Sequence, residues 1–177
     1  MYLPPYPVFP VLYAQRVVLR EVKSADIPDI VEISTYDGQR ASNPEDARKM
    51  LEKIERDYQN SDSVNWGIAD PATNEMMGTC GYYRGFKNGT GELGCILRPA
   101  FRGKGFMSEA MQVAAGFGIR EMGLQRVIAI TGKDNGKAIS LLERSRFVLI
   151  SQANAKGLED ILSDLKDDQL LFLFAGV

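Results

Sequence analysis

The sequence predicts a single mixed α/β domain in which one sheet is flanked by helices. Its 177 residues suffice for one domain with a substantial core. Hydrophobic residues make up 45% and charged residues 25% of the chain, which is typical of soluble proteins. Segments with strand and helix periodicity follow one another in the order β-α-α-β-β-β-α-β-α-β-β, and this order is typical of one mixed sheet.

The first half of the chain is expected to contain a strand, two helices and a meander. Residues 16–22 (RVVLREV) have strand character, and a first helix begins at Ser24. A second helix begins after Asn43, because Asn43-Pro44-Glu45 combines a capping residue, a proline at the first helical position and an acidic residue. This helix runs to about Tyr58. The meander strands are expected at 62–70, 76–86 and 92–98, with turns at 70–74 and 87–91.

The second half of the chain alternates helices and strands. A helix is predicted from about Lys104 to Met122, with Gly116 and Gly118 interpreted as close-packing positions against the sheet. Residues 126–131 (RVIAIT) form a continuous apolar run, which is typical of a buried parallel strand. The remaining elements are a helix at 135–145, a strand at 147–153, a short amphipathic helix at 157–166 and a strand at 169–175.

Residues 1–15 are expected to form a Pro-rich arm, and residues 16–177 a single domain. Four prolines lie within the first ten residues and favour extended backbone. We expect the arm to pack on the surface through Tyr2, Tyr6, Phe9 and Tyr13; a partner-binding motif is the alternative. A signal peptide is not expected, because the arm lacks a basic start and an uninterrupted apolar stretch.

Charge and composition exclude several classes of function. Lys plus Arg is 21 and Asp plus Glu is 23, so the net charge of −2 argues against electrostatic nucleic-acid binding. The chain contains no His, which excludes His-based catalysis and His metal ligands. Cys80 and Cys95 cannot build a disulfide framework or a four-Cys zinc site, so they are interpreted as core residues and no metal is expected. Two cysteines without a secretory signal favour the cytoplasm, and because the chain has no apolar window of about 18 residues, no membrane partner is expected.

One segment, residues 97–110 (LRPAFRGKGFMSEA), carries a chemical signal. A predicted strand ends there, a turn with Gly103 and Gly105 follows, and a helix begins. The glycines allow the backbone to approach a ligand closely, and the free N–H groups of a helix start favour an anion. Arg102 and Lys104 add positive charge, so the turn suits a pyrophosphate. A plain strand–helix turn with solvated basic residues is the alternative, because a lone G-x-G is weak evidence.

This segment resembles the acyl-CoA loop, Q/R-x-x-G-x-G/A, of the GNAT superfamily of N-acetyltransferases. Residues 94–99 and 107–110 are similar to its ribosomal-protein N-acetyltransferase (RimJ/RimL-like) branch, and residues 135–144 are similar to the Asn-led helix of that branch. The likeness spans residues 16–147 in element order and is motif-specific from 92 to 147. It implies an α/β fold of the α+β type, with a GNAT-like mixed, mostly antiparallel central sheet of six to seven strands and about four flanking helices.

The resemblance implies an N-acetyltransferase that uses acetyl-CoA as co-substrate and transfers the acetyl group directly to a primary amine. The backbone of Cys95, Ile96 and Leu97 would pair with the pantetheine arm, and an N–H there would polarise the acetyl carbonyl. The other residues expected at the cofactor are Arg102, Gly103, Lys104, Gly105, Phe106, Met107, Ser108 and Asn135. Capping of its own helix is the alternative role for Asn135.

Glu92 is the candidate catalytic residue. At pH 7 a lysine amine needs roughly 4–5 kcal/mol to become neutral and an α-amine only about 1 kcal/mol, so a general base is useful. Glu92 begins the strand that leads into the loop, where GNAT relatives often place a carboxylate. Strand alternation puts Glu92, Gly94 and Ile96 on one face. An exposed carboxylate at the end of a strand is the alternative.

Four residues depart from the family pattern, and two of them leave the identity of the general acid undetermined. Met107 stands where the loop prefers Gly or Ala, and Arg146 stands where a Gly precedes Phe147. Ala138 and Leu142 replace the usual Ser and the Tyr that protonates the departing thiolate. Water, a residue from elsewhere, or a weakened activity are the alternatives.

The acceptor is also open. The branch implies a protein N-terminal amine; a small amine (polyamine, amino acid or drug-like amine) is the second hypothesis, and a weakly catalytic or non-catalytic acyl-CoA-binding module is the third. Tyr83 and Arg84 are predicted to contact the acceptor, and residues 157–166 to cover its cleft. The sequence does not indicate whether the protein is a monomer or an oligomer.

Overall fold

The structure, a computed structural model, describes residues 1–176. Its main sheet contains β1 (Leu12–Tyr13), β2 (Val18–Glu21), β5 (Val64–Ala69), β6 (Met76–Tyr83), β7 (Thr90–Leu97), β8 (Arg126–Gly132), β9 (Phe147–Ile150) and β10 (Gln169–Phe174). A separate hairpin contains β3 (Thr35–Tyr36) and β4 (Gln39–Arg40). The α-helices are α1 (Ile27–Ile30), α2 (Pro44–Gln59), α3 (Phe106–Arg120), α4 (Gly136–Arg144) and α5 (Glu159–Ser163).

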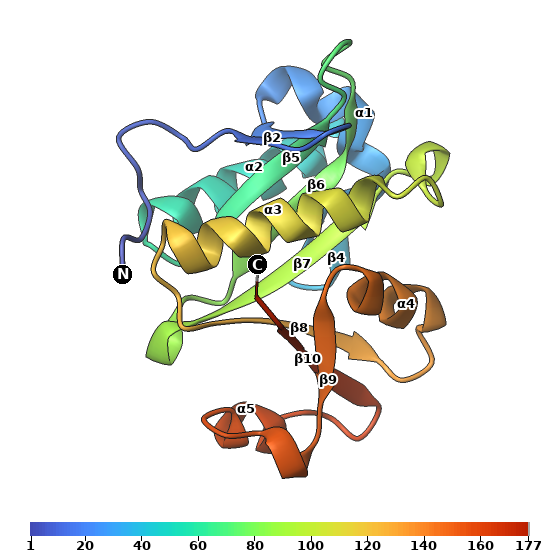
Figure 1. Cartoon of the computed structure of the whole chain (residues 1–177). Helices are drawn as coiled ribbons and strands as arrows, with labels where there is room; N and C mark the ends of the chain where they lie inside the picture. Colours follow the sequence, from blue (N-terminus) through green and yellow to red (C-terminus); the bar gives the residue numbers. More distant parts are fainter. Residues whose placement is uncertain (177) are drawn as a thin grey trace.

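The main sheet is eight-stranded, in the order β1-β2-β5-β6-β7-β8-β10-β9 (Figure 1). Its strands pair antiparallel except β7 and β8, which are parallel. The mixed, mostly antiparallel sheet is therefore confirmed, and so is the parallel strand at 126–131. The predicted number of six to seven strands is too low, because β1 comes from the arm and places Leu12 opposite Leu19 on β2. The α-helices number five, one more than the resemblance implies, and α5 lies within the short helix predicted at 157–166.

Helices on the two faces of the sheet produce separate apolar clusters. Helix α3 crosses one face (Figure 1), where Met111 packs with Trp66 and Leu93 in the main core. On the opposite face, Ile30 of α1 packs with Met76. Strand β8 contributes to both sides, because Val127 and Ala129 belong to the main core while Ile128 packs in another cluster with Leu158, beside α5.

The glycines predicted to pack against the sheet differ in what they contact. Gly118 lies so close to β6 that a Cβ there would collide with Tyr82 Oη, so this interpretation is confirmed. A Cβ at Gly116 would instead meet the side chain of Arg120, on the same helix. The interpretation of Gly116 was therefore wrong, although the residue is buried.

Local sequence signals located most of the elements. Asn43 caps α2, its side-chain oxygen accepting the backbone N–H of Asp46 at 2.9 Å. The β3–β4 hairpin was not predicted, although Asp37-Gly38 at its turn is a strong hairpin signal and both residues have positive φ, 48° and 75°. The predicted strand at 147–153 and helix at 157–166 are shorter in the structure, as β9 and α5. Among the described residues, no helix is long and apolar enough to cross a membrane.

The Pro-rich arm packs on its own chain. The Tyr2 backbone N–H donates to the Met122 carbonyl at 2.9 Å, and the Tyr6 N–H donates to Tyr58 Oη at 2.8 Å. The Phe9 ring lies between Tyr58 and Trp66, with centroid distances of 5.5 and 6.3 Å. The arm thus covers part of the main core, as predicted for Tyr6 and Phe9. Tyr13 does not take part, because it is 76% exposed.

Phe9→Ala tests the contribution of the arm to stability. We expect a loss of about 2 kcal/mol in the free energy of unfolding, below the cost of truncating a fully buried Phe. Denaturant unfolding followed by the fluorescence of Trp66, the one tryptophan of the chain, measures it. Val8→Ala is the control, because Val8 lies in the same arm and is 82% exposed. Equal stability of the two variants would contradict the packing role.

An ion pair fixes the start of α1 to the sheet. Arg20 on β2 donates to both Asp26 oxygens at 2.8 and 2.9 Å, and its Nε donates to Asn74 Oδ1 at 2.7 Å. Burial raises the pKa of Asp26, but the hydrogen bonds from Arg20 and the Lys23 N–H, together with the nearby positive charge, more than offset it. The pKa of Asp26 therefore lies below its ordinary value.

Asp26→Asn should cost about 2 kcal/mol of stability at neutral pH, since a hydrogen-bonded partner of a charged group is lost. A carboxyl whose pKa is lowered by folding contributes fully above its unfolded pKa of about 3.9 and loses this contribution as pH falls through its folded pKa. The wild type and the variant should therefore converge in free energy of unfolding below about pH 4. Urea unfolding between pH 7 and pH 3 measures this. A difference that stays constant over this range would contradict the assignment.

Candidate functional site

The parallel strands β7 and β8 pair over a short distance and then diverge. Their register runs from Thr90 opposite Arg126 to Glu92 opposite Ile128, although β7 continues to Leu97 and β8 to Gly132 (Figure 1). Residues 93–97 pair with β6 on one side, but no strand of the described chain pairs with their other side. Apart from the Leu97 carbonyl, which accepts a hydrogen bond from Arg102 Nε, backbone hydrogen-bonding groups on that side are therefore available to an extended ligand. This stretch includes the predicted cofactor residues Cys95, Ile96 and Leu97.

The glycine loop follows directly and opens α3. Gly103 and Gly105 have positive φ, 77° and 86°, and Gly105 is the N-cap residue of α3. Within residues 1–176, the backbone N–H groups from Gly103 to Met107 donate no hydrogen bond. Five unpaired donors at the positive end of a 15-residue helix make a suitable anion site. The predicted geometry of the loop is present in the structure.

The side chains of the loop have different surroundings. Arg102 folds back onto β7, and its Nε donates to the Leu97 carbonyl at 2.9 Å. Lys104 is exposed, with Nζ 5.8 Å from the Phe101 ring centroid. Phe106 is half-buried, and the Met107 side chain is buried in the main core. Met107 can therefore reach a cofactor only through its backbone.

The residues in and around α4 have structural roles. The Asn135 side-chain oxygen accepts the Ala138 N–H at 3.2 Å, so Asn135 caps α4. Ser108 on α3 receives a hydrogen bond from Ser145 Oγ at 3.0 Å and thereby connects α3 to the end of α4. Leu142 is only 4% exposed and packs in the main core, so α4 offers no proton donor at that position. Arg146 adopts a φ of 65°, a conformation that favours the Gly usual there in the family.

Glu92 is the last residue of β7 that pairs with β8, and the two strands diverge after it. Leu93 and Leu97 belong to the core under α3, so Glu92, Gly94 and Ile96 face the opposite side, as predicted. Arg84 Nη1 donates to both Glu92 oxygens at 2.9 and 3.0 Å. The Glu92 side chain is 15% exposed and that of Arg84 is 72% exposed. Glu92 is therefore a largely covered, ion-paired carboxylate rather than a free one at a strand end.

Tyr83 joins this cluster from β6, opposite Glu92 in the register. Its hydroxyl lies over Gly94, and a Cβ at Gly94 would collide with it. Burial, followed by the nearby charge of Glu92, raises the pKa of Tyr83, so its hydroxyl stays protonated and can donate. The structure thus brings Tyr83, Arg84 and Glu92 together where the pairing of β7 with β8 ends.

The two cysteines are poor nucleophiles. Cys80 is buried, and Cys95 Sγ lies 3.6 Å from Met111 Sδ under α3. Burial raises the pKa of Cys95 to about 12 and that of Cys80 well above its ordinary value. Because the thiolate is the reactive form, neither residue suits an acetyl-enzyme intermediate.

Sequence reasoning missed Arg16, which contacts the glycine loop from the start of the domain. Arg16 Nε donates to Glu109 Oε1 at 2.6 Å, and Nη1 donates to the Lys104 carbonyl at 2.9 Å. No local signal could have revealed these contacts, because Arg16 and Glu109 are 93 residues apart in the chain.

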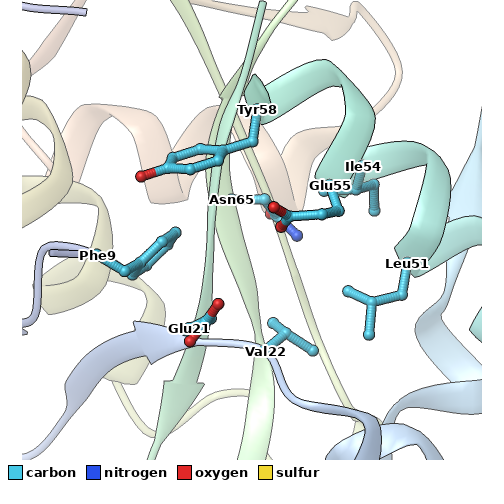
Figure 2. A pocket seen from close by; sticks show the side chains of 8 residues that line it. All are labelled: Phe9, Glu21, Val22, Leu51, Ile54, Glu55, Tyr58 and Asn65. Carbon is cyan, nitrogen blue, oxygen red and sulfur yellow. The ribbon is translucent and has the colours of Figure 1, made fainter. Parts of the chain in front are cut away.

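A cavity lies elsewhere, between α2, the end of β2 and the arm. Figure 2 shows the side chains that line it: Phe9, Glu21, Val22, Leu51, Ile54, Glu55, Tyr58 and Asn65. None of these belongs to the predicted site. Asn65 pairs with Gly81, which pairs with Gly94, so the cavity is two strands away from β7. Within residues 1–176, no three His, Cys, Asp or Glu side chains are grouped to hold a metal ion.

Comparisons with known proteins agree with this geometry. The uncharacterized N-acetyltransferase YoaA of Bacillus subtilis is 28% identical over 148 residues, which cover 79% of this chain and 84% of YoaA. The structure of RimL, a ribosomal L7/L12 alpha-N-protein acetyltransferase, in complex with coenzyme A superposes with a TM-score of 0.72 at 19% identity, covering 93% of this chain and 97% of RimL. A chimera of the spermidine N-acetyltransferase SpeG from Vibrio cholerae gives 0.67 at 16% identity, covering 90% and 93%.

A family model described as "Acetyltransferase (GNAT) domain" matches residues 16–148, about three quarters of the chain. The chain therefore belongs to the GNAT family of acetyltransferases.

Proposed function

We propose that the protein transfers the acetyl group of acetyl-CoA directly to a primary amine within a ternary complex. The divergence of β7 and β8 supports this proposal, because β7 carries Glu92 where its pairing with β8 ends, then a stretch that β8 does not pair with, and the Gly103–Gly105 loop follows the strand. A ligand with an extended amide-containing arm and a pyrophosphate matches the strand and the loop together.

The cofactor would bind through backbone groups for most of its length. The N–H groups from Gly103 to Met107 would receive the pyrophosphate, and Lys104 would add charge. The pantetheine arm would pair with residues 95–97 on the side that β8 leaves open. An N–H of the same stretch would hydrogen-bond the acetyl oxygen and stabilise the negative charge that develops there.

Glu92 is the proposed general base. The amine nitrogen attacks the thioester carbonyl carbon, the C–S bond breaks, and the thiolate leaves with the electron pair. The proton released by the amine passes to Glu92, directly or through a water, and then to solvent. Because Leu142 is buried and Ala138 carries no donor, solvent is the proposed proton source for the thiolate.

The proposed acceptor is a protein N-terminal amine. An α-amine has a pKa of about 7.7–8, so it needs far less help than a lysine amine to become neutral at pH 7. The cluster offers one carboxylate, already paired with Arg84. RimL and SpeG superpose on this chain almost equally, so the fold alone does not favour either class of acceptor. Acetyl transfer to peptides with free N-termini, compared with spermidine and free amino acids, tests this choice; a preference for the small amines would contradict it.

Gly105→Glu tests the cofactor loop. A side chain at φ 86° is strained, and a carboxylate there would repel a pyrophosphate. We expect acetyl-CoA affinity to fall at least about 100-fold, roughly 2.7 kcal/mol, in calorimetric titration. Gly38→Glu is the control for the backbone strain, because Gly38 also has a positive φ, 75°, but lies in the β3–β4 turn with open space around it. Retained binding by a folded Gly105→Glu would reject the loop assignment.

Glu92→Gln tests the general base. The amide keeps the shape but cannot accept the proton, so turnover should fall about 100-fold and its rise with pH should flatten. Acetyl-CoA affinity should stay within about twofold of the wild type, because the cofactor contacts come from backbone groups. Glu121→Gln, an exposed carboxylate just after α3, is the control. Unchanged turnover in Glu92→Gln would remove Glu92 from the mechanism.

A further inference from the structure

We propose that Arg16 is a positioning residue for the cofactor loop, which it holds in the orientation that presents its N–H groups to the pyrophosphate. The proposal rests on the proposed function above and adds a residue that lies outside the loop, just before β2. It predicts that the affinity for the pyrophosphate part of the cofactor depends on contacts between residues 88 and 93 positions apart in the chain.

Arg16 contacts three residues at the start of α3: Lys104, Phe106 and Glu109. Its Nη1 donates to the Lys104 carbonyl at 2.9 Å, and its guanidinium lies 5.2 Å from the Phe106 ring centroid. Its backbone N–H donates to Glu109 Oε2 at 3.0 Å, and its Nε donates to Oε1 of the same carboxylate at 2.6 Å. Backbone and side chain of one residue thus hold both the loop and the first turn of α3.

The contact with the Lys104 carbonyl determines where the next N–H points. In a trans peptide the C=O and N–H groups point in opposite directions. Because Arg16 holds the Lys104 oxygen on its own side, the Gly105 N–H must point to the other side. Gly105 lies between the unpaired donors of residues 103 and 107, so the contact fixes the peptide at the centre of the proposed anion site.

Glycine at position 105 fits this arrangement for a second reason. A Cβ there would lie 2.9 Å from Arg16 Nη2, closer than side chains normally approach. Gly105 therefore supplies the left-handed φ and also leaves space for the guanidinium.

Arg16 also compensates a charge that would oppose the cofactor. Glu109 lies in the first turn of α3, where its carboxylate stabilises the helix but would repel a bound pyrophosphate. The paired guanidinium offsets this negative charge. Loss of Arg16 should thus act twice, by freeing the loop peptide and by exposing the Glu109 charge.

The test compares ligands that contain or lack the pyrophosphate. Calorimetric titration with CoA and 3′-dephospho-CoA, and NMR titration with pantetheine, are carried out on the full chain. For Arg16→Gln we expect CoA and 3′-dephospho-CoA to bind at least about tenfold more weakly, and pantetheine affinity to be unchanged. Arg16→Lys, which keeps the charge but lacks the guanidinium fork, should lie between the wild type and Arg16→Gln.

Arg16→Gln combined with Glu109→Gln separates the two effects. The double variant should bind CoA more tightly than Arg16→Gln alone, because the repelling carboxylate is gone, and more weakly than the wild type, because the loop is not held. Arg48→Gln is the matched control, since Arg48 also pairs with glutamates but lies on the exposed face of α2.

Three results would overturn the positioning role. These are unchanged CoA affinity in Arg16→Gln, an equal loss of affinity for pantetheine, and a loss confined to CoA with 3′-dephospho-CoA unaffected. The last result would assign Arg16 to the 3′-phosphate instead. If Arg16→Gln does not fold, the same three comparisons apply to Arg16→Lys. Failure of the wild type to bind CoA would be distinct, because it would reject the proposed function itself.

Discussion

The early end of the parallel pairing between β7 and β8 is the constraint on which the rest of the site depends. The two strands share a register over three residue pairs, ending at Glu92 opposite Ile128. Beyond that point the two strands pair with different neighbours, because β7 pairs with β6 as far as Leu97 and β8 pairs with β10 as far as Gly132. A continuous sheet would have used the β7 backbone for β8. Divergence leaves that backbone available to a ligand, and it leaves Glu92 at the point where both strands still define its position.

The second constraint on the site is that side chains outside the Gly103–Gly105 turn restrict its conformation. A glycine-rich turn is conformationally free, so its N–H groups form a preorganised anion site only if other residues restrict it. Arg102 connects the loop to the end of β7 through the Leu97 carbonyl, and Arg16 connects it to the start of the domain. The chemistry of the loop is local in sequence, whereas its rigidity comes from elsewhere in the fold.

This division explains what the sequence predicted and what it did not. Asn43 and Asn135 act through neighbours three residues away, and both caps were foreseeable. The Glu92–Arg84 pair depends on the β6–β7 register, and Arg16–Glu109 spans 93 residues, so neither follows from local patterns. The loop geometry at Gly103 and Gly105 was recognisable because it depends on two glycines close in sequence. The β3–β4 hairpin was a different kind of failure, since its Asp-Gly turn was visible in the sequence.

The buried Leu142 raises the question of how the site would operate without an acid on α4. The departing thiolate needs a proton less than the attacking amine needs to lose one. A thiol has a pKa of about 8.5, so a thiolate is a tolerable leaving group near neutral pH, whereas an amine must lose a proton before or during attack. With Glu92 as the proposed general base and an apolar Leu142 in place of an acid, the site therefore keeps the group that would lower the barrier more. Leu142 packs in the main core, so this position contributes to the packing of α4. The position that the family resemblance associates with proton transfer is therefore occupied in this chain by a residue of the main core.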